Sequence, residues 1–291
     1  MKIIEVMSRS EQPVGASRKT VETLIFDSQR TILYEGDNKL DLNLKESVVL
    51  VTGSSSGIGK AAAIAFGVEG AQVGVTYRAN RQGAEDTAQK VRNAGGQALV
   101  LHYDLADPDS IRSIIDELDK EWGALHVLVN NAAPMEASGP TGQLFEEVPL
   151  KNWEGMLRKT LEGVTLTMQS ALPLLRKSGW GRIVTVSSDA VDGWPGLGPY
   201  ATAKAGLHGL SRTLAVELGP ANILSNVVMP GAVMTERTEH NLTPEQKEQI
   251  KQTMPTRRLI TPEDVAAFIV FLGSPVNRQI TGEIIPITGG R

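Results

Sequence analysis

Short apolar segments alternate with longer segments of helical periodicity from residue 48 onward. The apolar segments are rich in valine, isoleucine and leucine and lack strict apolar–polar alternation, which is typical of parallel strands covered on both faces. Their order with the helical segments predicts an α/β protein with a doubly wound parallel sheet. Strands are predicted at 48–51, 71–76, 99–103, 125–129, 183–186 and 223–228. Helices are predicted at 60–69, 84–93, 108–122, 153–177 and 200–218.

The beginning of the chain does not follow this pattern. Two β-prone segments at 20–26 and 30–35, separated by a short polar turn, predict a β-hairpin. A lone hairpin is marginally stable in water, so we expect it to dock on the main domain or on a neighbouring subunit; a disordered leader is the alternative. The sequence thus predicts an N-terminal extension at 1–45 and a single domain at 46–291, without internal repeats.

Composition excludes several classes of function. The net charge is −4 and no basic tract is present, so the chain lacks the electrostatic footprint of a nucleic-acid-binding protein. The absence of cysteine excludes disulfides, thiolate catalysis and cysteine-based zinc sites. No segment approaches the roughly 18 apolar residues of a membrane span, and the start has no signal-peptide pattern. We expect a cytoplasmic protein with no metal, membrane or nucleic-acid partner.

A glycine-rich segment at 52–59 stands between the first predicted strand and the first predicted helix. Glycine at such a turn lets backbone N–H groups approach a pyrophosphate at the helix N-terminus. The spacing is Gly-x3-Gly-x-Gly rather than the more common Gly-x-Gly-x-x-Gly, and a turn that merely links strand to helix is the alternative. The predicted dinucleotide contacts are Gly53, Ser55, Ser56, Gly57, Ile58 and Gly59.

The end of the second predicted strand indicates which dinucleotide is bound. An acidic residue there would bind a ribose 2′-hydroxyl and repel a 2′-phosphate. The sequence has Tyr77 and Arg78 instead, with no acid before Glu85. Arginine can hold a phosphate with two hydrogen bonds, so the sequence favours NADP(H), with Ser54 and Arg81 as helpers. A solvated loop arginine is the alternative.

A tyrosine and a lysine stand near the start of the last long predicted helix. The spacing of Tyr200 and Lys204 places both side chains on one helix face, one turn apart. A nearby ammonium group favours phenolate, so we expect a lowered pKa for Tyr200 and proton transfer from it to a carbonyl oxygen. Ser187 and Ser188 follow the fifth predicted strand, where a hydroxyl can bind the substrate oxygen; strand-end capping is the alternative.

Taken in order, these motifs resemble the short-chain dehydrogenase/reductase family over about residues 46–291. Within that family, the overall pattern is most similar to the 3-oxoacyl-[acyl-carrier-protein] reductases. The matching motifs are the loop at 52–59, Asp104-Leu105, the Asn-Asn-Ala-Ala segment at 130–133, Ser188, Tyr200 with Lys204, Pro230-Gly231 with Thr235, Thr281-Gly282 and Gly289-Gly290.

The resemblance implies a Rossmann fold, further cofactor contacts and an assembly. Members of the family are usually homotetramers, here through the helices predicted at 153–177 and 200–218; a homodimer is the alternative. Lys204 would also hold the nicotinamide ribose, and Thr235 would bind the carboxamide. The other cofactor contacts implied are Asp104 and Leu105 near the adenine, Asn131 and Ala132 along the cleft, and Pro230, Gly231 and Val233 near the nicotinamide.

The chain departs from the family pattern at two positions. Ala133 replaces a glycine, which is a mild change. Thr160 replaces an asparagine that helps to hold a proton-relay water beside the lysine, and threonine lacks the paired donor and acceptor of an amide. We expect a slower or altered relay rather than an inactive enzyme; an ordinary threonine on a buried helix face is the alternative.

A substrate lid is predicted at about 233–256. Met135, Trp194 and Leu197 are expected in loops facing the same cleft, which favours a partly apolar substrate, although such residues often simply pack. The predicted reaction is the NADP(H)-dependent reduction of a ketone, either a 3-oxoacyl thioester or a related small-molecule or carrier-bound carbonyl. A catalytically weak NADP(H)-binding sensor or assembly protein is one alternative, and a lyase or epimerase is another. The arginines that could meet an acidic carrier protein are Arg237, Arg257 and Arg258, for which ordinary surface charge is the alternative.

Overall fold

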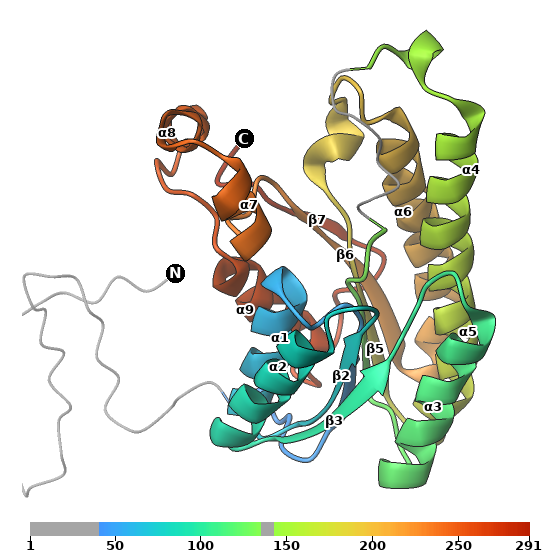
Figure 1. Cartoon of the computed structure of the whole chain (residues 1–291). Helices are drawn as coiled ribbons and strands as arrows, with labels where there is room; N and C mark the ends of the chain where they lie inside the picture. Colours follow the sequence, from blue (N-terminus) through green and yellow to red (C-terminus); the bar gives the residue numbers. More distant parts are fainter. Residues whose placement is uncertain (1–40, 135–142) are drawn as a thin grey trace, which may run out of the picture. The chain divides into compact units, whose positions relative to one another are not determined.

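The computed structural model describes residues 41–134 and 143–291. The hairpin predicted at 20–35 lies outside these residues. The unit from Leu42 to Arg291 is built on a parallel sheet of seven strands in the order β3-β2-β1-β4-β5-β6-β7 (Figure 1). The predicted doubly wound sheet is therefore confirmed. The strands are β1 (Val48–Val51), β2 (Gln72–Tyr77), β3 (Gln97–His102), β4 (Val127–Asn130), β5 (Gly181–Val186), β6 (Ile223–Pro230) and β7 (Ile284–Ile287).

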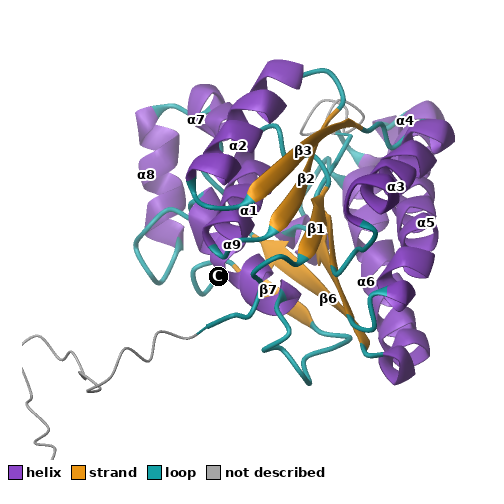
Figure 2. Cartoon of the chain, turned by 90° about the horizontal axis from the view of Figure 1, so that it is seen from below, coloured by secondary structure: helices purple, strands orange, loops and turns teal. Residues whose placement is uncertain are grey.

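Helices cover both faces of the sheet, as Figure 2 shows. One face carries α1, α2 and α9, and the other carries α3, α5 and α6. Parallel neighbouring strands must be joined by a crossover connection, here a helix, that packs on one face of the sheet. Because the chain builds the sheet outward from β1 in both directions, its helices cover both faces. The helices are α1 (Gly57–Val68), α2 (Arg81–Asn93), α3 (Pro108–Trp122), α4 (Leu150–Leu157), α5 (Gly163–Lys177), α6 (Gly198–Leu218), α7 (Glu236–Asn241), α8 (Pro244–Thr253) and α9 (Pro262–Gly273).

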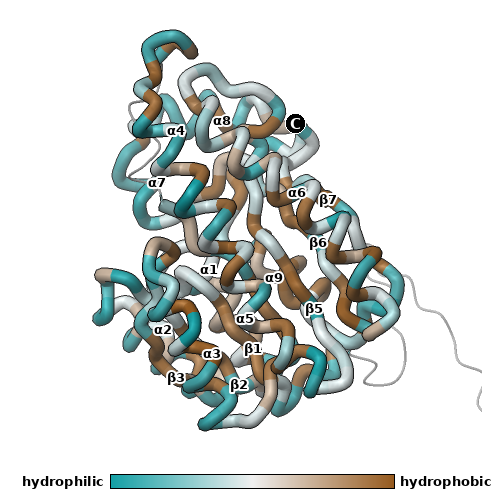
Figure 3. The backbone as a smooth tube through the Cα atoms, turned by 90° about the vertical axis from the view of Figure 1, so that its right-hand side faces the viewer, coloured by the Kyte–Doolittle hydropathy of each residue, from teal (hydrophilic) through white to brown (hydrophobic). Residues whose placement is uncertain are grey.

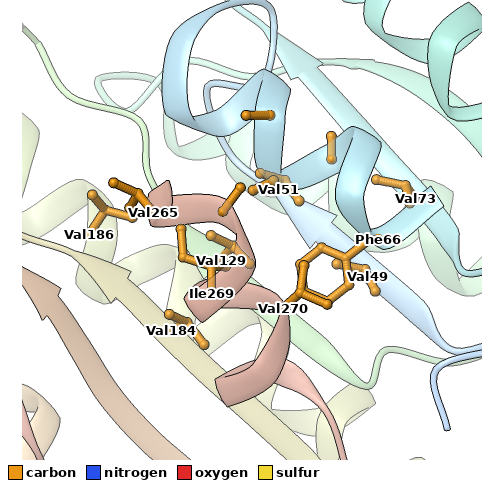
Figure 4. Close-up of a cluster of buried hydrophobic side chains, with 14 of the residues drawn as sticks. Val49, Val51, Phe66, Val73, Val129, Val184, Val186, Val265, Ile269 and Val270 are labelled. Atoms are coloured by element: carbon orange, nitrogen blue, oxygen red, sulfur yellow. The ribbon is translucent and has the colours of Figure 1, made fainter. Parts of the chain in front are cut away.

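The apolar runs of the central strands fill two cores, one on each face of the sheet (Figure 3). Val49 and Val51 of β1 point toward α1 and α9, while Leu50 points toward the opposite helices. Phe66 of α1 is fully buried in the first core beside Val270 of α9 (Figure 4). Removal of its ring would cost about 3–5 kcal/mol of stability, as for buried aromatics in general. Burial on both faces explains why the strands lack a polar side.

The helical regions differ from the sequence prediction at three places: the helix predicted at 153–177, the lid, where α7 and α8 were not predicted as helices, and α9. The single helix predicted at 153–177 is interrupted by a π-helical turn, η3 (Arg158–Glu162), between α4 and α5. Such a turn inserts one extra residue and is often found at functional sites. Helix α9 was not predicted, although Thr261 and Asp264 form a capping box before a long apolar run. That signal was present in the sequence and was missed.

The fold opens at the carboxyl edge of the sheet. β1 lies between β2 and β4, so the chain leaves β1 toward one side of the sheet and reaches β4 from the other. Connections that diverge in this way leave a crevice outside the carboxyl ends of the strands, where ligands bind in open α/β sheets. The helices α7 and α8 of the predicted lid stand beside this edge (Figure 1).

Candidate active site

A cleft of about 690 Å³ opens at the carboxyl edge of the sheet. Its walls bring together segments from β1, β2, β4, β5 and β6, the start of α6 and the first turn of the lid. Of the predicted catalytic and cofactor-binding residues, Gly59, Thr160 and the two expected helpers Ser54 and Arg81 are not part of its lining. The predicted residues that do line it are Gly53, Ser55, Ser56, Gly57, Ile58, Tyr77, Arg78, Asp104, Leu105, Asn131, Ala132, Ser188, Tyr200, Lys204, Pro230, Gly231, Val233 and Thr235.

The glycine loop between β1 and α1 is closely packed against the loop after β4. Gly53 has a positive φ of 66°, and a Cβ atom there would lie 2.9 Å from the Cα atom of Ala132. Asn131 donates from Nδ2 to the carbonyl oxygens of Thr52 and Gly53, at 2.9 and 3.0 Å. A Cβ atom on Gly59 would overlap both the Gly53 carbonyl oxygen and the Asn131 amide. Gly59 therefore allows the close packing of this loop and does not itself line the cleft.

The N-terminus of α1 already holds an anionic group of the protein. The backbone N–H of Gly57 donates to Oε2 of Glu236 at 3.0 Å, and Lys60 donates to Oε1 at 2.8 Å. The hydrogen bond from Lys60 is the main cause that lowers the pKa of Glu236. Free N–H groups at a helix N-terminus favour anions. Sequence spacing could not have predicted this contact, since Glu236 comes from the lid.

The far end of the cleft lies beside the carboxyl end of β2. Tyr77, Arg78 and Asn80 line it, and Asp104 is the carboxylate that stands nearby after β3. The two residues expected to assist Arg78, which are Ser54 and Arg81, do not line the cleft. Ser54 is fully buried, where it donates to the Val51 carbonyl and accepts from the Thr76 N–H, each at 2.8 Å.

The second helper, Arg81, lies on the surface of the first turn of α2. Its side chain is 72% exposed and pairs with Glu85 four residues further on, at 3.5 Å. It is not part of the cleft lining. Arg78 is therefore the predicted phosphate ligand that reaches the cleft, and neither Arg81 nor Ser54 assists it.

Ser188, Tyr200 and Lys204 lie together on one wall of the cleft. Lys204 is 3% exposed, donates to the Val186 carbonyl at 2.7 Å, and has its Nζ 5.8 Å from the centre of the Tyr200 ring. Ser188 is the N-cap of the short 3₁₀ helix η4 (Asp189–Asp192), where it accepts from the Ala190 N–H at 3.2 Å. It is also hydrogen-bonded to Tyr200. Both interpretations of Ser188, as a cap and as a site residue, are therefore compatible.

Burial controls the ionisation of both titratable groups on this wall. It raises the pKa of Tyr200 above its ordinary value, partly offset by the hydrogen bond with Ser188. It lowers the pKa of Lys204 to about 8. The expected lowering of the tyrosine pKa by the lysine is thus not found: desolvation of the phenolate is the largest influence, and Lys204 is not among the groups that lower the pKa. In this state Tyr200 is a neutral phenol at pH 7 and carries a proton that it can donate.

Thr160 lies behind the cleft wall rather than in it. Its side chain is fully buried in η3, and Oγ1 donates to the sulfur of Met156 at 3.3 Å. The cleft is instead lined by the preceding residue, Lys159, which sequence analysis did not single out. The π-helical turn changes the rotation of the helix here, and this cannot be read from a regular helical periodicity.

Ser187, which the sequence offered beside Ser188, lines the cleft and is hydrogen-bonded to Nε2 of His208 at 2.7 Å. Arg237, expected as a carrier contact, also lines the cleft, and so does Glu236, which was not predicted as a site residue. Trp194 and Leu197, which were expected to face it, do not line it. Trp194 instead lies against the guanidinium of the C-terminal Arg291, 4.5 Å from the ring centre. Met135, which was also expected to face the cleft, lies outside the described part of the chain. Arg257 and Arg258, expected as carrier contacts, are not part of the cleft lining.

Within residues 41–134 and 143–291, no cluster of three or more histidine, aspartate or glutamate side chains could hold a metal ion. In the same residues, no helix is both long and apolar enough to cross a membrane.

A parallel doubly wound sheet with a glycine loop and a serine–tyrosine–lysine wall defines the class of this protein. A family model described as enoyl-(acyl carrier protein) reductase matches residues 53–291. The chain belongs to the short-chain dehydrogenase/reductase family and is an oxidoreductase of that family.

Two curated relatives cover most of the chain. The 3-oxoacyl-[acyl-carrier-protein] reductase FabG of Aquifex aeolicus is 36% identical over 253 residues, which are 86% of this chain and 99% of the relative. The enzyme of the same name from Staphylococcus aureus is 33% identical over 243 residues, covering 83% of this chain and 96% of the relative.

Solved structures are similar to a comparable extent. A 7α-hydroxysteroid dehydrogenase in complex with NADH and 7-oxo glycochenodeoxycholic acid has a TM-score of 0.79 and 31% identity, covering 86% of this chain and 96% of that one. A dehydrogenase/reductase from Sinorhizobium meliloti has a TM-score of 0.78 and 30% identity, with the same coverage.

Proposed function

We propose that this protein is an NADP(H)-dependent reductase that converts a ketone into a secondary alcohol. The observation that carries the proposal is the wall formed by Ser188, Tyr200 and Lys204, which borders the same cleft as the glycine loop. A buried neutral phenol beside a lysine whose pKa is lowered to about 8 is suited to donating a proton and recovering it.

The cleft fits a dinucleotide. The N–H of Gly57 at the start of α1 donates to the carboxylate of Glu236 in this structure, and a pyrophosphate would use the same donor. At Gly53 a Cβ atom would meet the backbone of Ala132, so glycine is what lets this loop lie against the loop after β4. Arg78 would hold the 2′-phosphate, and Thr235 with Val233 would border the nicotinamide, which supplies the hydride when bound.

The residues of the wall have separate tasks in this mechanism. Ser188 donates a hydrogen bond to the substrate carbonyl oxygen and holds it beside Tyr200. As negative charge develops on that oxygen, the phenol O–H of Tyr200 breaks and its proton moves to the oxygen, which leaves a phenolate. The ammonium of Lys204, 5.8 Å from the centre of the Tyr200 ring, stabilises this phenolate and reprotonates it.

The substrate class follows from the relatives. We propose a 3-oxoacyl thioester, since two relatives that match nearly over their full length are 3-oxoacyl-[acyl-carrier-protein] reductases. A free ketone on an apolar ring system is the second candidate, because a structurally similar protein was solved with a 7-oxo steroid. As in the family, we propose a homotetramer built through α5 and α6 in the cytoplasm.

Binding and turnover test this proposal separately. Tryptophan fluorescence is titrated with NADPH and with NADH, and oxidation of the nicotinamide is then followed with 3-oxoacyl thioesters and simple ketones. We expect tighter binding of NADPH and turnover with at least one carbonyl. Binding without turnover on any of them would favour the alternative of a cofactor-binding sensor or assembly protein.

The phosphate assignment has its own test. We expect Arg78→Ala to raise the KM for NADPH by about tenfold and the KM for NADH by less than about twofold, because one charge-assisted contact with the 2′-phosphate is lost. Arg81→Ala is the matched control, since that exposed arginine pairs with Glu85 and lies outside the cleft lining. Equal increases for both cofactors would contradict the assignment.

A further inference from the structure

Reduction of a ketone consumes one proton from solvent in each turnover, and this inference rests on that proposed reaction. Tyr200 supplies the proton from a site where burial dominates its pKa, and Lys204 behind it is 3% exposed. Once cofactor and substrate fill the cleft, water no longer reaches these groups freely from its mouth. The proton must then arrive through the protein wall.

Ser187 and His208 form a polar connection through this wall. Oγ of Ser187 and Nε2 of His208 are 2.7 Å apart. Ser187 lines the cleft, whereas His208 lies on α6, one helical turn beyond Lys204, and is half-buried. The pair therefore has one member at the cleft and the other partly open to solvent.

The lysine lies directly beside this pair. Lys204 donates to the carbonyl of Val186, whose peptide bond leads into Ser187. One N–H of its ammonium is used in this bond, and no other hydrogen bond of Lys204 is formed with the described residues. An ammonium has three donors, so two remain for groups in or behind the cleft.

Polar groups continue along the same face of the sheet. Thr185 precedes Ser187 by two strand positions, so the two side chains point to the same side. The Thr185 hydroxyl and the side chain of Asn130, its neighbour on β4, are buried and have no hydrogen-bond partner within the described residues. Buried polar groups of this kind are normally satisfied by ordered water. Water bound to these groups would lie on the same face of the sheet as the Ser187 side chain.

Thr160 offers no such connection. Its hydroxyl proton is directed at the sulfur of Met156, and it does not line the cleft. Its carbonyl and its side chain lie in a π-helical turn whose cleft-facing member is Lys159. A path through Ser187 and His208 is therefore better supported by hydrogen bonds than a path through Thr160.

We propose that Ser187 and His208 are the proton-entry pair of this active site. After the phenolate of Tyr200 has taken a proton from Lys204, the amine recovers one from the Ser187 hydroxyl, directly or through one water. In the same concerted shift, Nε2–H of His208 gives its proton to Oγ of Ser187 and Nδ1 takes one from solvent, so neither an alkoxide nor an imidazolate is left. Release of the Nδ1 proton to solvent and uptake of a proton at Nε2 restore the starting tautomer before the next turnover. The net result is one proton moved from solvent to Tyr200, with no redox change. His208 is a positioning residue that acts through Ser187, since it touches no reacting atom.

The charges around His208 suit this task. Burial is the main cause that lowers its pKa, the positive charges of Arg212 and Lys204 lower it further, and Asp192 opposes them. The imidazole is therefore neutral at pH 7 and has one nitrogen that donates and one that accepts.

Kinetics of His208→Phe and Ser187→Ala test the pair. We expect kcat to fall by about tenfold in each, with an increased solvent deuterium isotope effect and little change in the KM for the cofactor, because proton supply becomes rate-limiting. The double variant should be no slower than the slower single variant. His208→Ala should regain rate on addition of imidazole, which a purely structural role would not produce.

His126→Phe is the matched control. His126 is also a half-buried histidine whose pKa is lowered by burial, but it accepts from the Val48 N–H at the opposite edge of the sheet. Its replacement should lower stability without changing the solvent isotope effect. An unchanged kcat and isotope effect in His208→Phe, in a protein that does turn over, would overturn the proton-entry pair and leave the proposed reductase intact.

A measurement without turnover keeps the two proposals separate. The chain has four histidines, so each can be titrated by NMR in ¹⁵N-histidine-labelled protein and assigned by its substitution. We expect Lys204→Met to raise the pKa of His208 and Ser187→Ala to change its tautomer. If no carbonyl is reduced, the reductase proposal fails, and the pair is then judged by this titration alone. A His208 signal that responds to neither substitution would overturn it.

Discussion

A buried cation lies at each end of strand β5, Arg182 of the strand itself at one end and Lys204 of α6 at the other, and the two have different tasks. Arg182, near the amino end, is 2% exposed, and Lys204 packs against the carboxyl end with 3% exposure. The guanidinium donates to the carbonyl oxygens of Asn277, Gly181 and Asn222 and lies 5.2 Å from the centre of the Trp180 ring. Among the residues that the structure describes, the ammonium has one acceptor, the Val186 carbonyl.

The difference in hydrogen bonding decides what each cation can do. Burial lowers the pKa of Arg182 only to about 10, so the guanidinium stays charged at neutral pH. Its hydrogen bonds connect the segments around Asn222 and Asn277 at the amino edge of the sheet. Burial also lowers the pKa of Lys204 to about 8, close to the range in which enzymes work. A satisfied guanidinium is a structural element, whereas a buried amine with spare donors can exchange a proton.

The largest expected effect is at Tyr200, where a substitution should lower the rate of the chemical step without changing cofactor binding. We expect Tyr200→Phe to lower kcat by about 10²–10⁴-fold, because the phenol that donates the proton is removed. Cofactor affinity measured by fluorescence should stay within about twofold, since only the transition state uses this hydroxyl. Turnover at the parent rate would remove Tyr200 from the role of acid.

The next prediction concerns the amino edge. We expect Arg182→Met to lower the free energy of unfolding by about 2–4 kcal/mol, because buried carbonyl groups lose their donors. Urea denaturation measures this loss, and the affinity for NADPH of the folded protein should not change. Arg278→Met is the control, since Arg278 is exposed beside the same loop. A destabilised protein with a changed cofactor affinity would show that the two edges are coupled.

A pH profile tests the ionisation of Lys204. We expect kcat/KM for reduction to fall as the pH rises through about 8, because the neutral amine no longer holds the proton that Tyr200 recovers. The same shift makes stability rise with pH from about 8 to the ordinary lysine value of 10.5, where the unfolded chain binds a proton that the folded one does not. In Lys204→Arg the break near pH 8 should be absent, and its persistence would assign it to another group.

The smallest expected effect is at the lid. We expect Glu236→Gln to lower the Kd for NADPH by about threefold, because a carboxylate no longer competes with the pyrophosphate for the N-terminus of α1. Isothermal titration at low salt measures it. Glu239→Gln, an exposed position on the same helix, is the control. Weaker binding in Glu236→Gln would mean that the glutamate supports the cofactor rather than excluding it.

Much of the fold was predictable because local patterns and tertiary structure agree. The strand at 48–51 and the helix at 108–122 have the predicted bounds, and the other predicted elements differ by a few residues at their ends, except the helix at 153–177, which is interrupted. Helix α3 shows why: an Asp107 N-cap, a proline at the first position and a left-handed Gly123 mark both ends in the sequence itself. No such signal marks the π-helical turn at 158–162, which only packing defines.

The candidate site was predictable to the extent that short motifs carry it. The loop at 52–59 and the spacing of Tyr200 and Lys204 are local, and the structure brings both to one cleft. The contacts of Glu236 with the N-terminus of α1 and of Ser187 with His208 join residues 179 and 21 positions apart. No periodicity reports such pairs.

The sequence by itself determined the alternation of buried strands and helices, the glycine loop and the identity of the groups available for chemistry. Tertiary structure alone decided their ionisation and their roles. It buried Tyr200 enough to raise its pKa, where sequence spacing to Lys204 had predicted the opposite, and it directed Thr160 away from the cleft. The physical reason is that desolvation and hydrogen bonding depend on neighbours from distant parts of the chain, which a linear pattern does not contain.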